Sequence, residues 1–156
     1  MSSAFVKEEE GGEAFEDLPD RPISPHTNFV TPEGLAQVEA ELTRLHDEHA
    51  AAQAAGDKIA IAKTSRDLRY WTARRASAQI VQPPRDASEV HFGSTVTIER
   101  DDGRRQTFRI VGEDEADPAR GSVSWVSPVA QALLGKGEGD TAMVAGGEVE
   151  IVAIGA

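Results

Sequence analysis

A seven-residue apolar repeat begins just after a helix-start signal near residue 31, and it constrains the fold more than any other feature. Thr31 can cap a helix, Pro32 suits its first turn, and Glu33 suits the positive end of the helix dipole. The repeat weakens toward its far end and consists of Leu35, Val38, Leu42, Leu45, His49, Ala52 and Gly56. This spacing predicts a long helix with one narrow apolar seam.

A turn at Gly56-Asp57 ends this helix, and Pro83-Pro84 ends the apolar frame that follows. The second frame consists of Ile61, Leu68, Trp71 and Ala78, with Arg75 intruding. Two helices of roughly 25 residues joined by so short a turn must run antiparallel. Residues 31–82 are therefore predicted to form a coiled-coil hairpin, which projects from the domain that anchors its base.

Residues 85–156 show the pattern of a small β-rich domain. The expected strands cover 95–100, 106–111, 122–126, 141–144 and 148–154. Asp101-Asp102-Gly103 is a hairpin turn signal, and Ser127-Pro128 starts a short helix because a cap precedes a first-turn proline. The predicted class is α+β, with a helical hairpin followed by a half-wrapped antiparallel sheet that covers one short helix.

Charge is unevenly distributed along the chain, whose net charge is −11. Residues 1–20 are rich in Glu, Gly and Asp, and two prolines follow within 21–30. We expect residues 1–30 to be a disordered acidic tail with a proline-containing linker. The negative charge argues against a free-standing or sequence-specific nucleic-acid binder, because phosphates would be repelled.

Several function classes are excluded by residues that are absent. The chain has no cysteine, which excludes disulfides, thiol catalysis and cysteine-based metal sites and fits a cytoplasmic location. It has no apolar run of 18 residues, so no membrane-spanning helix is predicted. No catalytic triad order, phosphate loop or zinc signature is present, and the chain is not expected to be an enzyme.

Two groups of polar residues invite a metal hypothesis that we do not favour. His46 and His49 lie three residues apart on the first helix, but no third or fourth ligand follows at a useful spacing, so we interpret both as surface residues. The acidic run 113–117 lacks the glycine-bearing spacing of a calcium loop, and we interpret it as a solvated loop.

The order of these parts resembles the GreA/GreB family of bacterial transcript-cleavage and elongation factors. The resemblance covers about residues 31–156 and leaves the tail outside. The residues that carry it are Thr31-Pro32-Glu33-Gly34-Leu35, Phe92-Gly93-Ser94-Thr95-Val96, Arg109-Ile110-Val111-Gly112-Glu113-Asp114-Glu115-Ala116-Asp117, Ser127-Pro128-Val129-Ala130-Gln131-Ala132-Leu133-Leu134-Gly135-Lys136 and Gly139-Asp140.

The resemblance implies a fold, a partner and a docking loop. Members of this family bind RNA polymerase at the rim of its secondary channel through a C-terminal domain of FKBP-like fold, and the coiled coil enters the channel. The implied polymerase-binding residues here are Ser127, Pro128, Val129 and Ala130, with Trp125 as a neighbour that alternation places on the core side. The chain is expected to act as a monomer without a cofactor of its own.

The tip of the hairpin departs from the family pattern, which is Gly-Asp-Leu-Ser-Glu-Asn. Here the tip residues are Gly56, Asp57 and Lys58, and Ala60 stands where the second carboxylate of the family falls. The family uses its acids to help hold a magnesium ion that belongs to the polymerase. Asp57 alone, together with polymerase carboxylates, remains as a weak ligand for that ion. The arms also look about two turns shorter, so we expect weak or no stimulation of transcript cleavage.

Two other functions stay open at the level of sequence. A relative with a shorter hairpin regulates nucleoside diphosphate kinase, and the coil here looks intermediate in length. An FKBP-like domain could also be a peptidyl-prolyl isomerase, but that chemistry needs a deep aromatic pocket, and residues 85–156 offer only Phe92, Phe108 and Trp125.

Overall fold

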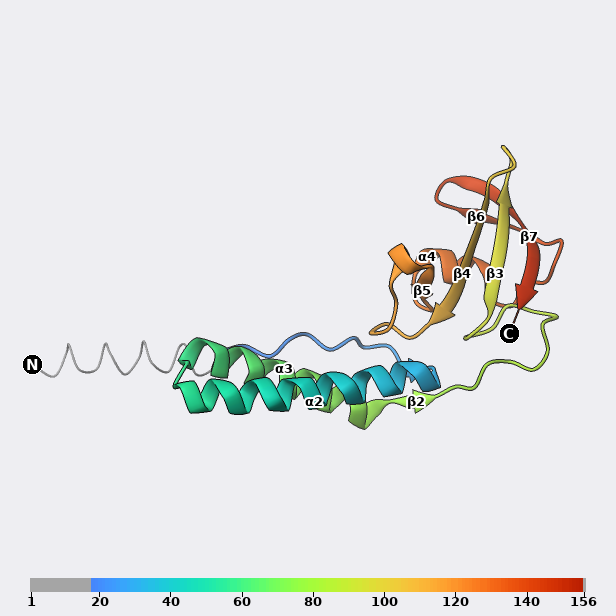
Figure 1. Cartoon of the computed structure of the whole chain (residues 1–156). Helices are drawn as coiled ribbons and strands as arrows, with labels where there is room; N and C mark the ends of the chain where they lie inside the picture. Colours follow the sequence, from blue (N-terminus) through green and yellow to red (C-terminus); the bar gives the residue numbers. More distant parts are fainter. Residues whose placement is uncertain (1–17, 156) are drawn as a thin grey trace, which may run out of the picture. The chain divides into compact units, whose positions relative to one another are not determined.

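The computed structural model describes residues 18–155, which separate into two compact units (Figure 1). One unit holds residues 37–77 of the hairpin together with residues 18–25. The other unit holds residues 26–36 and 78–155. The first turn of the hairpin thus belongs with the β domain. The predicted hairpin, residues 31–82, therefore extends beyond the compact unit at both ends.

The predicted hairpin is confirmed, with helix α2 over Pro32–Ala55 and helix α3 over Lys58–Ser77. Side-chain contacts between the two helices run in opposite chain order, since His49 meets Thr64 and Glu39 meets Arg75. Figure 1 shows the two ribbons side by side. No helix among residues 18–155 is long and apolar enough to cross a membrane.

The seam of α2 follows the predicted repeat, but the seam of α3 does not. Four of the α2 repeat positions are buried: Val38, Leu42, Leu45 and Ala52. On α3 the buried side chains are Ala62, Thr64 and Arg74, whereas the predicted apolar residues Ile61, Leu68 and Trp71 are only half-buried. The buried positions of α3 are thus two small side chains and one arginine, and the larger apolar side chains lie partly exposed.

The segment before the hairpin lies along α3. Arg69 donates to the carboxylate of Asp20 at 2.5 Å and to the Leu18 carbonyl at 2.9 Å. The Arg21 guanidinium lies 4.0 Å from the centre of the Tyr70 ring, a cation–π contact, and pairs with Asp67 at 3.4 Å. The prediction of a disordered tail therefore fails for residues 18–25, because these ion pairs and ring contacts hold them. Residues 1–17 lie outside the described part of the chain.

A short two-stranded sheet joins the chain before the hairpin to the chain after it. Strand β1, Phe29–Val30, runs parallel to strand β2, Gln79–Ile80. The pairing continues beyond β2, because Val81 donates its N–H to the Val30 carbonyl at 2.9 Å. Residues 28–30 thus form part of the folded body and are not the linker that the sequence suggested.

The β domain contains a five-stranded sheet with the order β5-β4-β3-β7-β6. Its elements are β3 Thr95–Arg100, β4 Arg105–Val111, η1 Pro118–Arg120, β5 Ser122–Ser124, α4 Pro128–Leu133, β6 Thr141–Val144 and β7 Gly147–Gly155. The predicted antiparallel arrangement holds for three of the four pairings. The β4–β5 pair is parallel, because the chain from 112 to 121 returns to the level of Arg109 and β5 then runs beside the last three residues of β4.

The core of this domain lies between the sheet and α4. Alternate residues of β3 and β4 are buried, as are Ala130 and Leu133 on the inner side of α4. The buried core residues are Val90, Val96, Ile98, Phe108, Ile110, Ala130, Leu133, Ala142, Val144, Val149, Ile151 and Ile154. The sheet thus covers one short helix, as predicted, and α4 is held firmly enough to present the loop before it.

A carboxylate from the acidic loop accepts hydrogen bonds from the start of α2, a contact called the Glu115 clasp below. Glu115 accepts the Thr31 backbone N–H at 2.9 Å and the Gly112 N–H at 3.2 Å, and the Thr31 hydroxyl also donates to it. A Cβ on Gly34 would lie 2.2 Å from Glu115 Oε2, so any other residue at this position would displace the carboxylate from its present place. The interpretation of this run as a solvated loop is therefore wrong for Glu115, which satisfies free N–H groups at a helix N-terminus.

A second acid at the same end of α2 faces the sheet. Glu33 lies 3.4 Å from the Arg109 guanidinium on β4. Its own backbone N–H and the charge of Arg109 lower the pKa of the Glu33 carboxyl. Because the pKa of Glu33 is lower in the folded than in the unfolded protein, the ionised carboxylate stabilises the fold when the pH is above the unfolded-state pKa. This stabilisation is lost as the pH falls through the folded-state pKa. The contact is exposed, so the contribution is small.

We expect Glu115→Gln to lower the free energy of unfolding by about 1–3 kcal/mol, because an amide nitrogen would face the Thr31 donors. Urea unfolding of the full chain measures this loss. Asp117→Asn is the matched control, since the Asp117 carboxylate forms only an exposed pair with Arg120 at 3.5 Å. Equal effects of the two substitutions would show that the clasp adds no stability.

Candidate functional site

The tip of the hairpin is a turn of minimal length in which one residue ends α2 and the next starts α3. Gly56 has φ +66° and donates its N–H to the Gln53 carbonyl, while Asp57 donates to the Ala52 carbonyl. These two bonds form a Schellman motif at the end of α2. Asp57 Oδ1 then accepts the Ala60 N–H at 3.1 Å, which caps α3.

The chemistry of the tip follows from these caps. Asp57 is the one carboxylate among residues 56–61, and its Oδ1 already accepts a backbone N–H. Lys58 is exposed beside it, Ile59 is 52% exposed, and Ala60 occupies the third helical position, where a glutamate would reach back toward the cap. Within residues 18–155 no three His, Asp or Glu side chains converge to hold a metal ion. The residues of the tip do not fit a magnesium site built by this chain.

The two histidines of α2 have different environments. His46 is exposed, as predicted. His49 is half-buried, and its Nδ1 lies 2.7 Å from the hydroxyl of Thr64, which also donates to the Ala60 carbonyl. The interpretation of His49 as a surface residue is therefore wrong, because its place in the apolar repeat turns it toward α3. It joins the two arms near the tip.

The Ser127-Pro128 loop begins α4 and is held by several local hydrogen bonds. The Ser127 hydroxyl accepts the Ala130 N–H at 3.3 Å, and its carbonyl accepts the Gln131 N–H. The Gln131 amide donates to the Trp125 carbonyl at 2.7 Å. Pro128 is exposed and Val129 half-buried, whereas Ala130 is fully buried. The loop is thus a rigid surface feature, and Ala130 is a core residue that supports it.

Trp125, just before this loop, belongs to a cluster of aromatic rings. Trp125 packs edge-on against Phe29 with ring centres 5.2 Å apart, and against His26 at 6.0 Å. Phe29 also meets Phe92 at 6.0 Å. The prediction that Trp125 faces the core is confirmed, since it packs against the buried cluster. Sequence reasoning missed His26 and Phe29, because a proline-flanked segment rich in polar residues carries no periodic signal.

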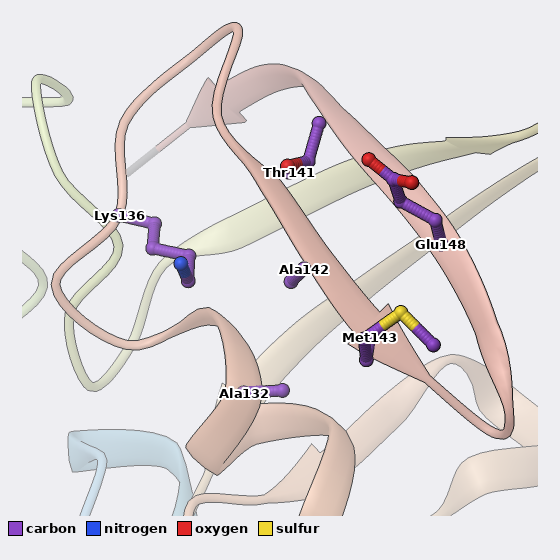
Figure 2. Close-up of a pocket in the computed structure, with 6 residues that line it drawn as sticks. All are labelled: Ala132, Lys136, Thr141, Ala142, Met143 and Glu148. Carbon is purple, nitrogen blue, oxygen red and sulfur yellow. The ribbon is translucent and has the colours of Figure 1, made fainter.

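The β domain offers no aromatic pocket for a proline ring among its described depressions. One is lined by Arg100, Arg104, Arg105, Gln106 and Ala145. The other is lined by Ala132, Lys136, Thr141, Ala142, Met143 and Glu148 (Figure 2). Neither of these two linings contains the aromatic rings that a site for a proline ring needs.

Comparison with known proteins assigns the chain to a family. Residues 85–155 match a family model described as transcription elongation factor, GreA/GreB, C-terminal. The transcription elongation factor GreB of Neisseria meningitidis serogroup B is 36% identical over 133 residues, which cover 72% of this chain and 82% of that protein. The chain belongs to the GreA/GreB family.

Other members of the GreA/GreB family agree with this assignment. GreB of Pseudomonas aeruginosa is 34% identical over 134 residues, covering 74% of this chain and 80% of that protein. The crystal structure of GreA factor homolog 1 of Thermus thermophilus covers 84% of this chain and all of its own, with 21% identity and a TM-score of 0.40. That structural likeness is too low to add to the argument.

Asp57 can be tested for its structural role separately from its charge. Asp57→Asn keeps a capping oxygen and should leave the hairpin nearly as stable, whereas Asp57→Ala removes the cap and should cost about 1 kcal/mol. Thermal unfolding followed by circular dichroism measures both. An equal loss in the two variants would mean that charge, and not capping, is the contribution of Asp57 to stability.

Proposed function

We propose that this GreA/GreB factor binds RNA polymerase through the Ser127-Pro128 loop, that its hairpin enters the secondary channel, and that it modulates elongation with little or no stimulation of transcript cleavage. It is a factor without chemistry of its own, because any cleavage uses the polymerase active site and its magnesium. Membership of the family and the names of its relatives support the partner.

The composition of the tip carries the proposal of weak cleavage. A family tip with two acids offers two carboxylates to a metal ion, whereas this tip offers one, whose Oδ1 already accepts a backbone N–H. Lys58 follows Asp57 in the sequence, and its ammonium group repels a magnesium ion that approaches the Asp57 carboxylate. Magnesium is usually held by only one or two protein carboxylates, so the loss of one removes a large share of the ligands that the protein supplies.

The rigidity of the Ser127-Pro128 loop supports its role in docking. An exposed proline next to half-buried apolar side chains, on a loop whose backbone is fixed by Ser127 and Gln131, is pre-organised for contact. The buried methyl of Ala130 cannot touch a partner and serves the core instead. We therefore assign contact to Ser127, Pro128 and Val129 and support to Ala130.

Cleavage should be restored by the missing acid. Ala60→Glu places a carboxylate at the third position of α3. We expect the rate of RNA shortening in a backtracked complex to rise at least about tenfold over the native protein, a threshold set below the roughly 100- to 10,000-fold attributed to a positioned catalytic group. Asp57→Asn in the same background should abolish the gain. Rapid cleavage by the native protein that depends on Asp57 would contradict the proposal.

Docking should depend on the loop and not on the tip. Pro128→Ala keeps the cap of α4, so the domain should fold as before, yet binding to purified polymerase should weaken about 5- to 30-fold, corresponding to roughly 1–2 kcal/mol for an exposed apolar anchor. Asp57→Ala is the control and should bind normally. Co-purification and fluorescence anisotropy measure both, and capture of nucleoside diphosphate kinase instead of polymerase would favour the alternative partner.

A further inference from the structure

Strand β6 is one of the two edge strands of the five-stranded sheet, the other being β5. The unpaired backbone groups of β6 are the first observation for a second interaction surface. Ile151 donates its N–H to the Asp140 carbonyl, which fixes the alternation of the β6–β7 ladder. By that alternation the N–H and C=O groups of Thr141 and Met143 point away from β7. Among the described residues no other group bonds them. Four backbone groups are therefore available to an added strand.

Apart from its short length of four residues, strand β6 lacks the usual devices that protect an edge. Its sequence, Thr141–Val144, contains no charge, no proline and no bulge, and Met143 is 63% exposed. A depression of about 530 Å³ lies along it. Figure 2 shows Lys136 and Ala132 on one side of the β6 ribbon and Glu148, on β7, on the other.

The side chains around β6 define what an added strand must carry. On the inner side the depression is lined by the methyl groups of Ala132 and Ala142, which leave space for an apolar side chain. On the outer side Glu148 and Glu150 lie directly across from Met143 and Thr141, and both are exposed. An extended segment with apolar residues on its inner face and basic residues on its outer face complements both sides.

A second copy of this chain complements the edge poorly. The outward residues of β6 are Thr141 and Met143, so a paired copy would bring no cation to Glu148 or Glu150. Each chain also carries a net charge of −11, which opposes self-association. Lys136, on the inner side, disfavours a segment that is basic on both faces.

We propose that strand β6 is a docking site for an extended segment of a protein partner in which apolar and basic residues alternate. The segment adds to the sheet as a sixth strand through the backbone groups of Thr141 and Met143. Its basic side chains are long enough to reach across β6 toward Glu148 and Glu150, which lie one strand further in, on β7. Its apolar side chains fill the depression over Ala132 and Ala142. This site is independent of the Ser127-Pro128 loop and does not rest on polymerase binding.

A peptide titration of the full-length protein tests the proposal. The probe is a synthetic octapeptide of alternating Lys and Val, and the matched control is a block peptide of four Lys followed by four Val. We expect the alternating peptide to bind at least about threefold more tightly, since only it can present one charge to each outer partner. Hydrogen exchange should slow at the amides of Thr141 and Met143 and remain unchanged at Ala142.

Charge-reversal variants separate this site from general attraction to an acidic protein. Glu148→Lys should weaken binding of the alternating peptide about threefold or more. Asp47→Lys changes the net charge equally at an exposed position of the hairpin and should have little effect. Equal binding of the two peptides, or unchanged exchange at Thr141 and Met143, would overturn the proposal. Protection of those amides without peptide, together with a dimer in sedimentation, would assign the edge to a second copy and would also overturn it.

Discussion

The carboxylate of Glu115 joins two parts of the chain that are more than 80 residues apart, and the β domain depends on this contact. It receives backbone N–H groups from the first residue of the α2 cap and from the turn after β4. A helix N-terminus has free N–H groups that must find acceptors, and a carboxylate also meets the positive end of the dipole there. Gly34 and Gly112 are small because this carboxylate and the Phe29 carbonyl occupy the space.

The same region shows how the loop proposed for docking is supported by residues outside the matched family domain. Phe29 lies in strand β1, and it packs on Trp125, whose carbonyl receives the Gln131 amide. The chain from His26 to Ala36 therefore belongs physically to the β domain although it precedes the hairpin in sequence. A truncated protein that began at residue 85 would lose the Glu115 contact to Thr31 and the Phe29–Trp125 contact together.

Much of the fold could be predicted from local patterns. The Thr31-Pro32 start, the Gly56-Asp57 turn and the Ser127-Pro128 start all appear where capping chemistry placed them. Alternation gave β3 its bounds, because one face of that strand is buried. Patterns with no local signal were not predictable: Glu115 stands in a run of acids that looks solvated, and the ring contacts of Arg21 and Phe29 depend on residues far along the chain.

The compact turn at Gly56-Asp57 limits how this hairpin can change in length. Because no flexible residue separates the two caps, removal of a single residue from one arm would rotate its remaining side chains by about 100° relative to the other arm. Val38 or Leu42 would then turn toward water. Viable length variants must lose or gain whole seven-residue repeats from both arms at once, so reach along such a hairpin comes in discrete steps of about 10 Å.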